Sequence, residues 1–341
     1  MNALVTGGGG FLGGAIVRKL LARGDTVRSF TRSAYPWLGE IGVEQIHGNL
    51  DNPAEVLAAV AGCDVVFHVA AKAGVWGRYA DYYATNVVGT RNVLAACRQA
   101  GVSRLIYTST PSVVHTGADL EGATENLPYA THFLAYYPAT KAIAEAEVLA
   151  ANDDSLGTVA LRPHLIWGPG DPHLIPRVLS RAKAGRLRRI GTRPVTVDVT
   201  YVDNAADAHL NAADRITACA GKAYFISNDE PILLWDFLNR ILSDAGLPPV
   251  TRSIPTGLAK TAAFALEKVY RLLRLSAEPP TTRFVVSQLS TSHWYDISAA
   301  KRDLGYAPQV SVEEGLVRLA ASMRVTISDA REAEYSGTPR V

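Results

Sequence analysis

The 341-residue sequence lacks the features that would place it in several special classes of protein. Its three cysteines, Cys63, Cys97 and Cys219, are widely spaced and form no C-x-x-C pair, so we expect reduced, mostly buried thiols. No uncharged apolar run reaches the roughly 18 residues that a membrane-spanning helix needs. The net charge of +2 is too small to favour nucleic-acid binding, and the apolar fraction of 48% is that of an ordinary globular chain.

The sequence also lacks a secretion signal and a metal-binding pattern. No cationic leader precedes the first apolar residues, and the chain enters a glycine-rich turn at Gly7, so we expect a cytoplasmic protein. The histidines show no metal-ligand spacing, and we expect no metal site.

Short apolar strands alternate with helices through the first half of the chain. We predict strands at 3–6, 25–31, 43–47, 64–70, 104–108 and 158–162, and helices at 11–23, 53–61, 82–100 and 137–151. This alternation predicts a doubly wound α/β fold, in which helices cover both faces of a parallel sheet. We expect this domain over 1–165, a smaller C-terminal lobe over 166–326 and a polar, weakly ordered tail over 327–341. Residues 222–227 are candidates for a strand that returns to the main sheet.

A glycine-rich turn, Thr6–Gly13 (T-G-G-G-G-F-L-G), lies between the first strand and the first helix. Glycines allow the backbone to approach a pyrophosphate closely, and the N-terminus of the following helix attracts the anion. The second strand ends in Thr31-Arg32, where a site for NAD would usually carry an acidic residue. Because Arg32 offers a guanidinium group to a 2′-phosphate, we expect NADPH or NADP as the cofactor. Asn49 and Leu50, after the third strand, are expected at the adenine.

Tyr137 and Lys141 form a Y-x-x-x-K pair, which places a phenol and an ammonium group one turn apart on a helix. A phenol can donate the proton that a carbonyl reduction requires, and a nearby cation should lower its pKa. Thr110, after the strand at 104–108, is the expected hydrogen-bond donor to the substrate oxygen, with Ser109 as the alternative.

Together these features resemble the extended short-chain dehydrogenase/reductases, the superfamily of nucleotide-sugar epimerases and 3β-hydroxysteroid dehydrogenases. The resemblance covers nearly the whole chain. Besides the glycine turn and Y-x-x-x-K it rests on V-V-F-H-V-A-A at 65–71, N-V-V-G-T at 86–90, L-R-P at 161–163, G-P-G-D at 168–171, Y-V-D-N at 201–204 and D-L-G-Y at 303–306.

The resemblance implies that Tyr137 is the catalytic acid/base, that Lys141 binds the nicotinamide ribose and tunes the tyrosine, and that Thr110 holds the substrate oxygen. It further implies a supporting role for Asn86, an NADP-binding domain over 1–165 and a substrate-binding lobe over 166–326. The expected cofactor-binding residues are Gly7, Gly10, Phe11, Leu12, Gly13, Arg32, Asn49, Leu50, Ala70, Ala71, Lys72, Tyr137, Lys141 and Pro163.

Within the superfamily, Pro111-Ser112 replaces the Asp-Glu that dehydratases carry after the catalytic threonine, which disfavours dehydration. The segments 72–77 and 108–115 look most like a branch of bacterial reductases in long-chain olefin biosynthesis. That likeness implies reduction by NADPH of a hydrophobic β-keto acid with two alkyl tails, giving a 2-alkyl-3-hydroxyalkanoate. It also suggests a homodimer that docks with other enzymes of the olefin pathway. The alternatives are a 3β-hydroxysteroid or other hydrophobic-alcohol dehydrogenase, a nucleotide-sugar epimerase, and a non-catalytic NADP-binding scaffold.

Residues 257–275 predict an amphipathic helix. Its apolar stripe consists of Leu258, Ala262, Ala265, Leu266, Val269, Leu272 and Leu273, with Lys260, Lys268, Arg271 and Arg274 largely opposite. Such a stripe most often packs on the core. The alternatives are a cap over a hydrophobic substrate site and a basic surface for lipid or a partner protein, so a peripheral membrane contact stays open.

Overall fold

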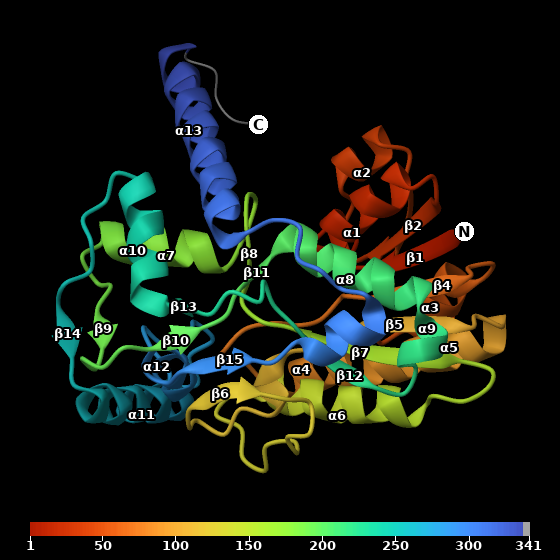
Figure 1. Ribbon diagram of the computed structural model, residues 1–341, viewed down its shortest axis with the longest axis horizontal. Coiled ribbons are helices and arrows are strands. Elements are labelled where there is room, and N and C mark those ends of the chain that lie inside the picture. The colour runs from red at the N-terminus through yellow and green to blue at the C-terminus, as the bar shows by residue number, and fades with distance from the viewer. Residues whose placement is uncertain (337–341) are drawn as a thin grey trace.

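The computed structural model describes residues 1–336 and the side chains of residues 1–324. A seven-stranded parallel sheet forms the centre of its larger lobe (Figure 1). The strand order is β12-β7-β5-β4-β1-β2-β3, and every neighbouring pair is parallel. The strands are β1 (Asn2–Thr6), β2 (Thr26–Thr31), β3 (Glu44–His47), β4 (Val65–His68), β5 (Arg104–Thr108), β7 (Gly157–Pro163) and β12 (Ala223–Ile226). The expected doubly wound fold is confirmed.

Helices cover both faces of this sheet. Helices α1 (Phe11–Ala22) and α8 (Val202–Asp214) pack together on one face, and α3 (Pro53–Val60), α5 (Gly89–Ala100) and α6 (Tyr136–Ala150) cover the other. The side chains of successive strand residues pack against opposite helix layers, because neighbouring side chains in a strand point to opposite faces of the sheet. In β1, for example, Val5 belongs to the α1 layer and Leu4 to the α3 layer. This burial on both faces explains why the strands read as nearly continuous apolar runs.

The helix predicted over 82–100 differs from expectation. It begins earlier, with α4 (Tyr79–Tyr83), and passes through a π-helical turn, η1 (Ala84–Val88), before α5. The hydroxyl of Thr90 donates a 2.7 Å hydrogen bond to the carbonyl oxygen of Asn86 inside this turn. Single π turns inside helices often occur at functional sites, and no helical periodicity reveals them.

A second, four-stranded sheet organises the smaller lobe, in the order β13 (Ile232–Leu233), β10 (Thr196–Val197), β15 (His293–Tyr295) and β6 (Leu120–Ala123). Chain segments cross between the two sheets in both directions. Strand β6 comes from the first half of the sequence, and β12 comes from the second half and pairs with β7. The two lobes are therefore separate in space but interleaved along the chain.

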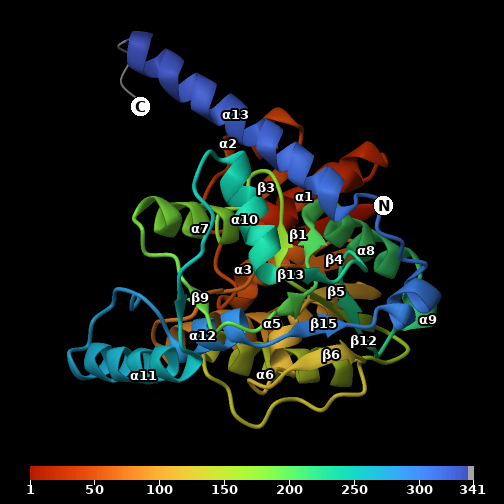
Figure 2. The same ribbon diagram turned by 60° about the vertical axis from the view of Figure 1, so that its left-hand side comes forward.

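The remaining elements are short connections and the helices of the smaller lobe (Figure 2). They are α2 (Pro36–Glu40), the 3-10 turn η2 (Pro111–Val113), β8 (Ile166–Trp167), α7 (Leu174–Lys183), β9 (Arg189–Ile190), β11 (Thr200–Tyr201), α9 (Ile216–Cys219), α10 (Leu234–Asp244), β14 (Ser253–Ile254), α11 (Thr256–Leu272), α12 (Arg283–Ser290), the π turn η3 (Ala300–Leu304) and α13 (Val312–Ser336).

Helix α13 extends into the segment that was expected to be a weakly ordered tail. It continues to Ser336 and projects from the body of the molecule, so residues 327–336 of the expected tail are helical, while 337–341 lie outside the described residues (Figure 1). None of the helices that the structure describes is long and apolar enough to cross a bilayer. The cysteines are free thiols, with Cys97 and Cys219 buried and Cys63 half-buried.

Helix α11 corrects the expectation that its apolar stripe packs on the core. The residues that it buries are Ala259, Ala263 and Glu267, which lie on a different face. Leu258, Val269, Leu272 and Leu273 of the stripe are exposed.

Candidate active site

The glycine turn takes the tight form that a dinucleotide-binding loop requires. Gly7 has a positive φ of 73°, which a residue with a side chain rarely adopts, and its carbonyl oxygen accepts a 2.9 Å hydrogen bond from the amide of Gly10. A Cβ atom on Gly13 would lie 2.1 Å from that same carbonyl oxygen. Gly13 therefore lets the first turn of α1 sit against the loop, which leaves the free amides of the helix N-terminus beside the turn.

A cavity of about 530 Å³ opens beside this turn, at the carboxyl ends of the strands. Most of the expected site residues meet in its wall: Gly7, Gly10, Phe11, Leu12, Gly13, Arg32, Asn49, Leu50, Ala70, Ala71 and Tyr137. The expected residues Thr110, Lys141, Lys72 and Pro163 are not in the wall. Pro163 ends β7 and is buried, and Lys141 lies behind the wall, where its ammonium group contacts Thr108, which does line the cavity.

Several lining residues were not found by sequence reasoning. The ring of Tyr35 lies over the glycine turn, because a Cβ on Gly9 would come within 2.2 Å of it. The smaller lobe contributes Ile166, His173 and Leu174. The signal that could have found them is G-P-G-D at 168–171. Its Asp171 carboxylate accepts backbone hydrogen bonds from His173, Leu174 and Ile175 and so starts helix α7 at the cavity.

Tyr137 lies in the first turn of α6, with its side chain half-buried. Burial raises the pKa of its phenol to about 12, and a hydrogen bond with Thr110 offsets part of this rise. The direction is opposite to the one that the Y-x-x-x-K spacing predicted. The phenol therefore stays protonated at neutral pH, which is the form that can donate a proton.

Lys141 is almost completely buried. Its ammonium group donates a 2.6 Å hydrogen bond to the carbonyl oxygen of Thr108 and lies 3.9 Å from the centre of the Tyr107 ring. Burial lowers the pKa of Lys141 to about 7, and the carboxylate of Glu145, one turn further along α6, opposes this shift. The ammonium group thus ties α6 to the end of β5, so that Tyr137 on α6 is fixed relative to Thr110, two residues after Thr108.

The hydroxyls of Ser109 and Thr110 differ in their surroundings. The Oγ of Ser109 is buried and has no hydrogen-bond partner among the described residues. The Oγ1 of Thr110 accepts a 3.3 Å hydrogen bond from the amide of Ser112, and the same side chain lies close enough to Tyr137 to lower the pKa of its phenol. This difference favours Thr110 as the partner of Tyr137.

Asn86 fixes the backbone around this pair from the π turn. Its amide oxygen accepts a 2.7 Å hydrogen bond from the amide of Lys72, and its Nδ2 donates to the carbonyl of Lys72 and to the hydroxyl of Thr140. Thr140 in turn donates to the carbonyl oxygen of Tyr137. Lys72 therefore takes part through its backbone, while its side chain lies 3.8 Å from Asp81.

A buried hydrogen-bond chain joins the π turn to the glycine turn. The Thr6 hydroxyl accepts from the amides of Val69 and Ala70, so its own proton goes to Nδ1 of His68. Nε2 of His68 then donates to Thr90, which bonds Asn86. Burial lowers the pKa of His68 to about 3, so this ring is neutral and its role is to hold the loop at Ala70 in place.

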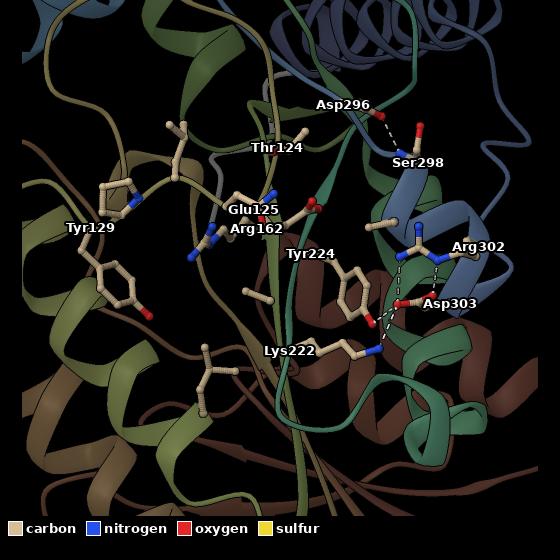
Figure 3. Close-up of a pocket in the computed structure, with 16 residues that line it drawn as sticks. Thr124, Glu125, Tyr129, Arg162, Lys222, Tyr224, Asp296, Ser298, Arg302 and Asp303 are labelled. Atoms are coloured by element: carbon tan, nitrogen blue, oxygen red, sulfur yellow. Dashed lines mark hydrogen bonds and ion pairs between the residues drawn. The ribbon is translucent and has the colours of Figure 1, made fainter.

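A second cavity, of about 640 Å³, lies where β12 meets η3 (Figure 3). Four of its polar side chains form one cluster: Lys222, Arg302 and the hydroxyl of Tyr224 all contact the carboxylate of Asp303. This accounts for the D-L-G-Y motif, because Asp303 and Tyr306, whose hydroxyl donates to the carbonyl of Ser227, clamp η3 onto the end of the main sheet. We assign this cavity a structural role.

Comparison with known proteins gives the chain its relatives. The sequence pattern of the 3-beta hydroxysteroid dehydrogenase/isomerase family matches residues 4–256. Two bacterial proteins named 2-alkyl-3-oxoalkanoate reductase are similar over most of the chain. The protein from Stenotrophomonas maltophilia is 55% identical, covering 94% of this chain and 99% of its own, and the protein from Shewanella oneidensis is 52% identical, covering 94% and 86%.

A more distant relative is the mouse sterol-4-alpha-carboxylate 3-dehydrogenase, decarboxylating, which is 37% identical over 93% of this chain and 90% of its own. Among solved structures, a short-chain dehydrogenase/reductase superfamily protein from Agrobacterium tumefaciens with bound NAD superposes with a TM-score of 0.75. It covers 97% of this chain and 100% of its own at 21% identity, a likeness that concerns the fold.

Proposed function

The chain belongs to the 3-beta hydroxysteroid dehydrogenase/isomerase family, and from this premise we propose that it reduces the ketone of a 2-alkyl-3-oxoalkanoate with a nicotinamide cofactor. The observation that carries the proposal is that Tyr137 lines the same cavity as the glycine turn, with Thr110 close enough to lower the pKa of its phenol. A proton donor and a cofactor loop on one cavity are what reduction of a ketone to an alcohol requires.

The relatives point to a common feature of the substrate. The name 2-alkyl-3-oxoalkanoate reductase describes a carboxylate one carbon away from the reacting ketone. The name sterol-4-alpha-carboxylate 3-dehydrogenase places a carboxylate on carbon 4, next to the reacting carbon 3. Both substrates are therefore hydrophobic β-oxygenated acids. This supports a β-keto acid over a simple steroid ketone.

The chain's own residues supply the proton and the orientation. When bound, a reduced nicotinamide dinucleotide supplies the hydride that becomes attached to the carbonyl carbon. Tyr137 donates its phenolic proton to the ketone oxygen as negative charge develops there, and Thr110 hydrogen-bonds the same oxygen. Lys141 fixes α6 against the end of β5 and so holds Tyr137 in place relative to Thr110. A contact of Lys141 with the nicotinamide ribose stays a prediction of the resemblance, because the side chain lies behind the cavity wall. The product is the 2-alkyl-3-hydroxyalkanoate.

The residues present fit a dinucleotide, and we propose NADPH in preference to NADH. The glycine turn and the N-terminus of α1 would hold the pyrophosphate, with Asn49 and Leu50 beside the adenine. Arg32 supports the preference, because it is an exposed cation in the cavity wall directly after β2. Its neighbours Thr31 and Ser33 are uncharged, so no carboxylate at this strand end would repel a 2′-phosphate.

The experiment that tests this function follows NADPH oxidation at 340 nm with a 2-alkyl-3-oxoalkanoate. A steroid ketone serves as the alternative substrate and NADH as the alternative cofactor. We expect turnover of the keto acid, with NADPH preferred. Turnover of the steroid alone would replace the substrate and keep the mechanism. Cofactor binding without oxidation by either ketone would contradict the proposal and favour a non-catalytic scaffold.

The resemblance also predicts the oligomeric state, the partner enzymes and the cellular location of the protein. A homodimer, docking with other enzymes of olefin biosynthesis and a cytoplasmic location stay predictions, to be tested by light scattering, co-purification and fractionation.

A further inference from the structure

We propose that the outer face of α11 binds the surface of a membrane that contains anionic phospholipid. This goes beyond the proposed function and does not depend on it, because it is argued from the exposure, the charge and the position of the helix alone.

The first argument is exposure. The outer face of α11 carries Leu258, Val269 and Leu272, whose side chains are 62%, 47% and 83% exposed, together with exposed Leu273. The helix packs on α12 through its small residues Ala259 and Ala263 instead. Large apolar side chains thus face outward on a helix whose inner face is already packed. An exposed patch of this kind marks an interaction surface.

The second argument is charge. Helix α11 and the three residues after it carry the cations Lys260, Lys268, Arg271 and Arg274 and a single acid, Glu267. Glu267 is buried and is bonded by Arg283, so it adds no negative charge to the outer surface. In the part of the chain that the structure describes, Lys260, Lys268 and Arg274 form no ion pair. Arg271 lies 3.9 Å from the buried Glu267, so it is partly paired. The three unpaired cations and Arg271 lie beside an apolar face and complement anionic headgroups.

The third argument is that the end of the helix is rigid. After Leu272 the chain turns at Arg274, which has a positive φ of 51°, and the amide of Leu275 donates a 2.9 Å hydrogen bond to the carbonyl of Tyr270. This is the pattern that closes a helix C-terminus. The Nε1 of Trp76 also donates a 3.3 Å hydrogen bond to the carbonyl of Leu275. Leu272, Leu273 and Leu275 are therefore held outward on a fixed corner, not on a loose end.

The fourth argument concerns size and position. Both views place α11 along an edge of the molecule (Figures 1 and 2). A 17-residue helix is about 25 Å long and about 10 Å wide, so its face offers roughly 250 Å². A stable protein interface needs about 800 Å² from each partner. By itself the face supplies less than a third of that area, whereas a helix face of this size suffices for insertion at a bilayer surface.

The test is flotation of the full chain with phospholipid vesicles. We expect the wild type to float with vesicles of phosphatidylglycerol and phosphatidylethanolamine, and to float at least about tenfold less with pure phosphatidylcholine. The matched variants are Val269→Asp on α11 and Val317→Asp on α13, since both valines are exposed and helical. Val269→Asp should reduce binding at least about tenfold. Val317→Asp should leave it unchanged.

A charge-reversed variant, Lys260→Glu with Lys268→Glu, leaves the leucines and valine of the face in place and tests the electrostatic part. It should remove the preference for phosphatidylglycerol. Thermal unfolding shows whether each variant is folded. Three results would overturn the proposal: no flotation of the wild type, equal losses for the two valine variants, or light scattering that shows a dimer which Leu272→Asp dissociates.

Discussion

The ammonium group of Lys141 donates a 2.6 Å hydrogen bond to the carbonyl oxygen of Thr108, at the end of strand β5 of the main sheet. This contact joins the helix that carries Tyr137 to the strand whose continuation carries Thr110. It also requires a cation to be buried, and burial lowers the pKa of Lys141 from its ordinary 10.5 to about 7.

The buried lysine predicts a specific dependence of stability on pH. Between pH 7 and pH 10.5 the unfolded chain binds the lysine proton more strongly than the folded chain, so this group's contribution to the free energy of unfolding increases as the pH rises. The cost of burying the cation is fully present below pH 7. Lys141→Met removes this dependence. Urea unfolding of wild type and variant should therefore give a stability difference that shifts in favour of the wild type from pH 7 to pH 10.

The matched control is Lys183→Met, which removes an exposed lysine from α7. A difference between wild type and Lys141→Met that stays constant over this range would show that Lys141 does not carry the shifted pKa.

Tyr137→Phe removes one hydroxyl from the cavity. Because the phenol is the only proton donor assigned to the ketone oxygen, we expect kcat/KM for the keto acid to fall by about 10² to 10⁴. The affinity for NADPH, measured by fluorescence titration, should change little. Tyr79→Phe, on the exposed side of α4, is the control and should keep wild-type turnover. Retention of more than about a tenth of the activity by Tyr137→Phe would remove the tyrosine from its assigned role.

Arg32→Ala tests the cofactor preference. A guanidinium contact with a 2′-phosphate is a charged hydrogen bond worth about 1.5–3 kcal/mol, so its loss should lower kcat/KM for NADPH roughly 10- to 100-fold. The value for NADH should stay nearly unchanged, since that cofactor has no 2′-phosphate. The control is Arg18→Ala, which removes an exposed arginine of α1 that lies outside the cavity wall. Equal losses with both cofactors would show that Arg32 does not select between them.

Glu145→Gln tests the buried ion pair between Glu145 on α6 and Arg162 on β7. The side chains of Glu145 and Arg162 are 0% and 4% exposed and form a 2.6 Å ion pair, which the hydroxyl of Tyr129 extends. Removing the carboxylate leaves a buried guanidinium group without its counter-ion, so we expect a loss of about 3–5 kcal/mol in the free energy of unfolding.

Glu147→Gln, two residues further along α6, breaks the surface pair with Arg91 and should cost no more than about 1 kcal/mol. Denaturant unfolding of the two variants compares them directly. Similar losses for both would mean that burial does not set the strength of the Arg162 pair.

The main sheet could be predicted from the sequence because parallel strands buried on both faces leave continuous apolar runs, separated by glycines and helices. The strand ends then brought Gly7, Arg32, Asn49 and Ala70 to one cavity, since all parallel strands present their carboxyl ends at the same edge. The π turn at Asn86 could not be predicted, because Asn86 bonds Thr140 and Lys72, which are distant in sequence. The pairing of β6 with β15 could not be predicted either, since these two strands are also far apart in the sequence.

Two predictions failed for lack of three-dimensional information. Sequence spacing places Lys141 one turn from Tyr137 but does not show that its ammonium group points to Thr108, so the direction of the tyrosine's pKa shift was wrong. The stripe on α11 was expected to be buried, but Ala259 and Ala263 permit closer packing on α12 and leave the leucines outside. Helical periodicity shows that two faces differ, but not which face is covered.

The most direct test of the proposed function is to supply the enzyme with NADPH that carries deuterium at carbon 4, prepared separately for each face of the ring. The product formed from a 2-alkyl-3-oxoalkanoate is then analysed by mass spectrometry. We expect one of the two labelled cofactors, and not the other, to place a single deuterium on carbon 3 of the 2-alkyl-3-hydroxyalkanoate, at a rate that Tyr137→Phe reduces at least a hundredfold. A product without deuterium from either cofactor, or no 3-hydroxy product at all, would contradict the account.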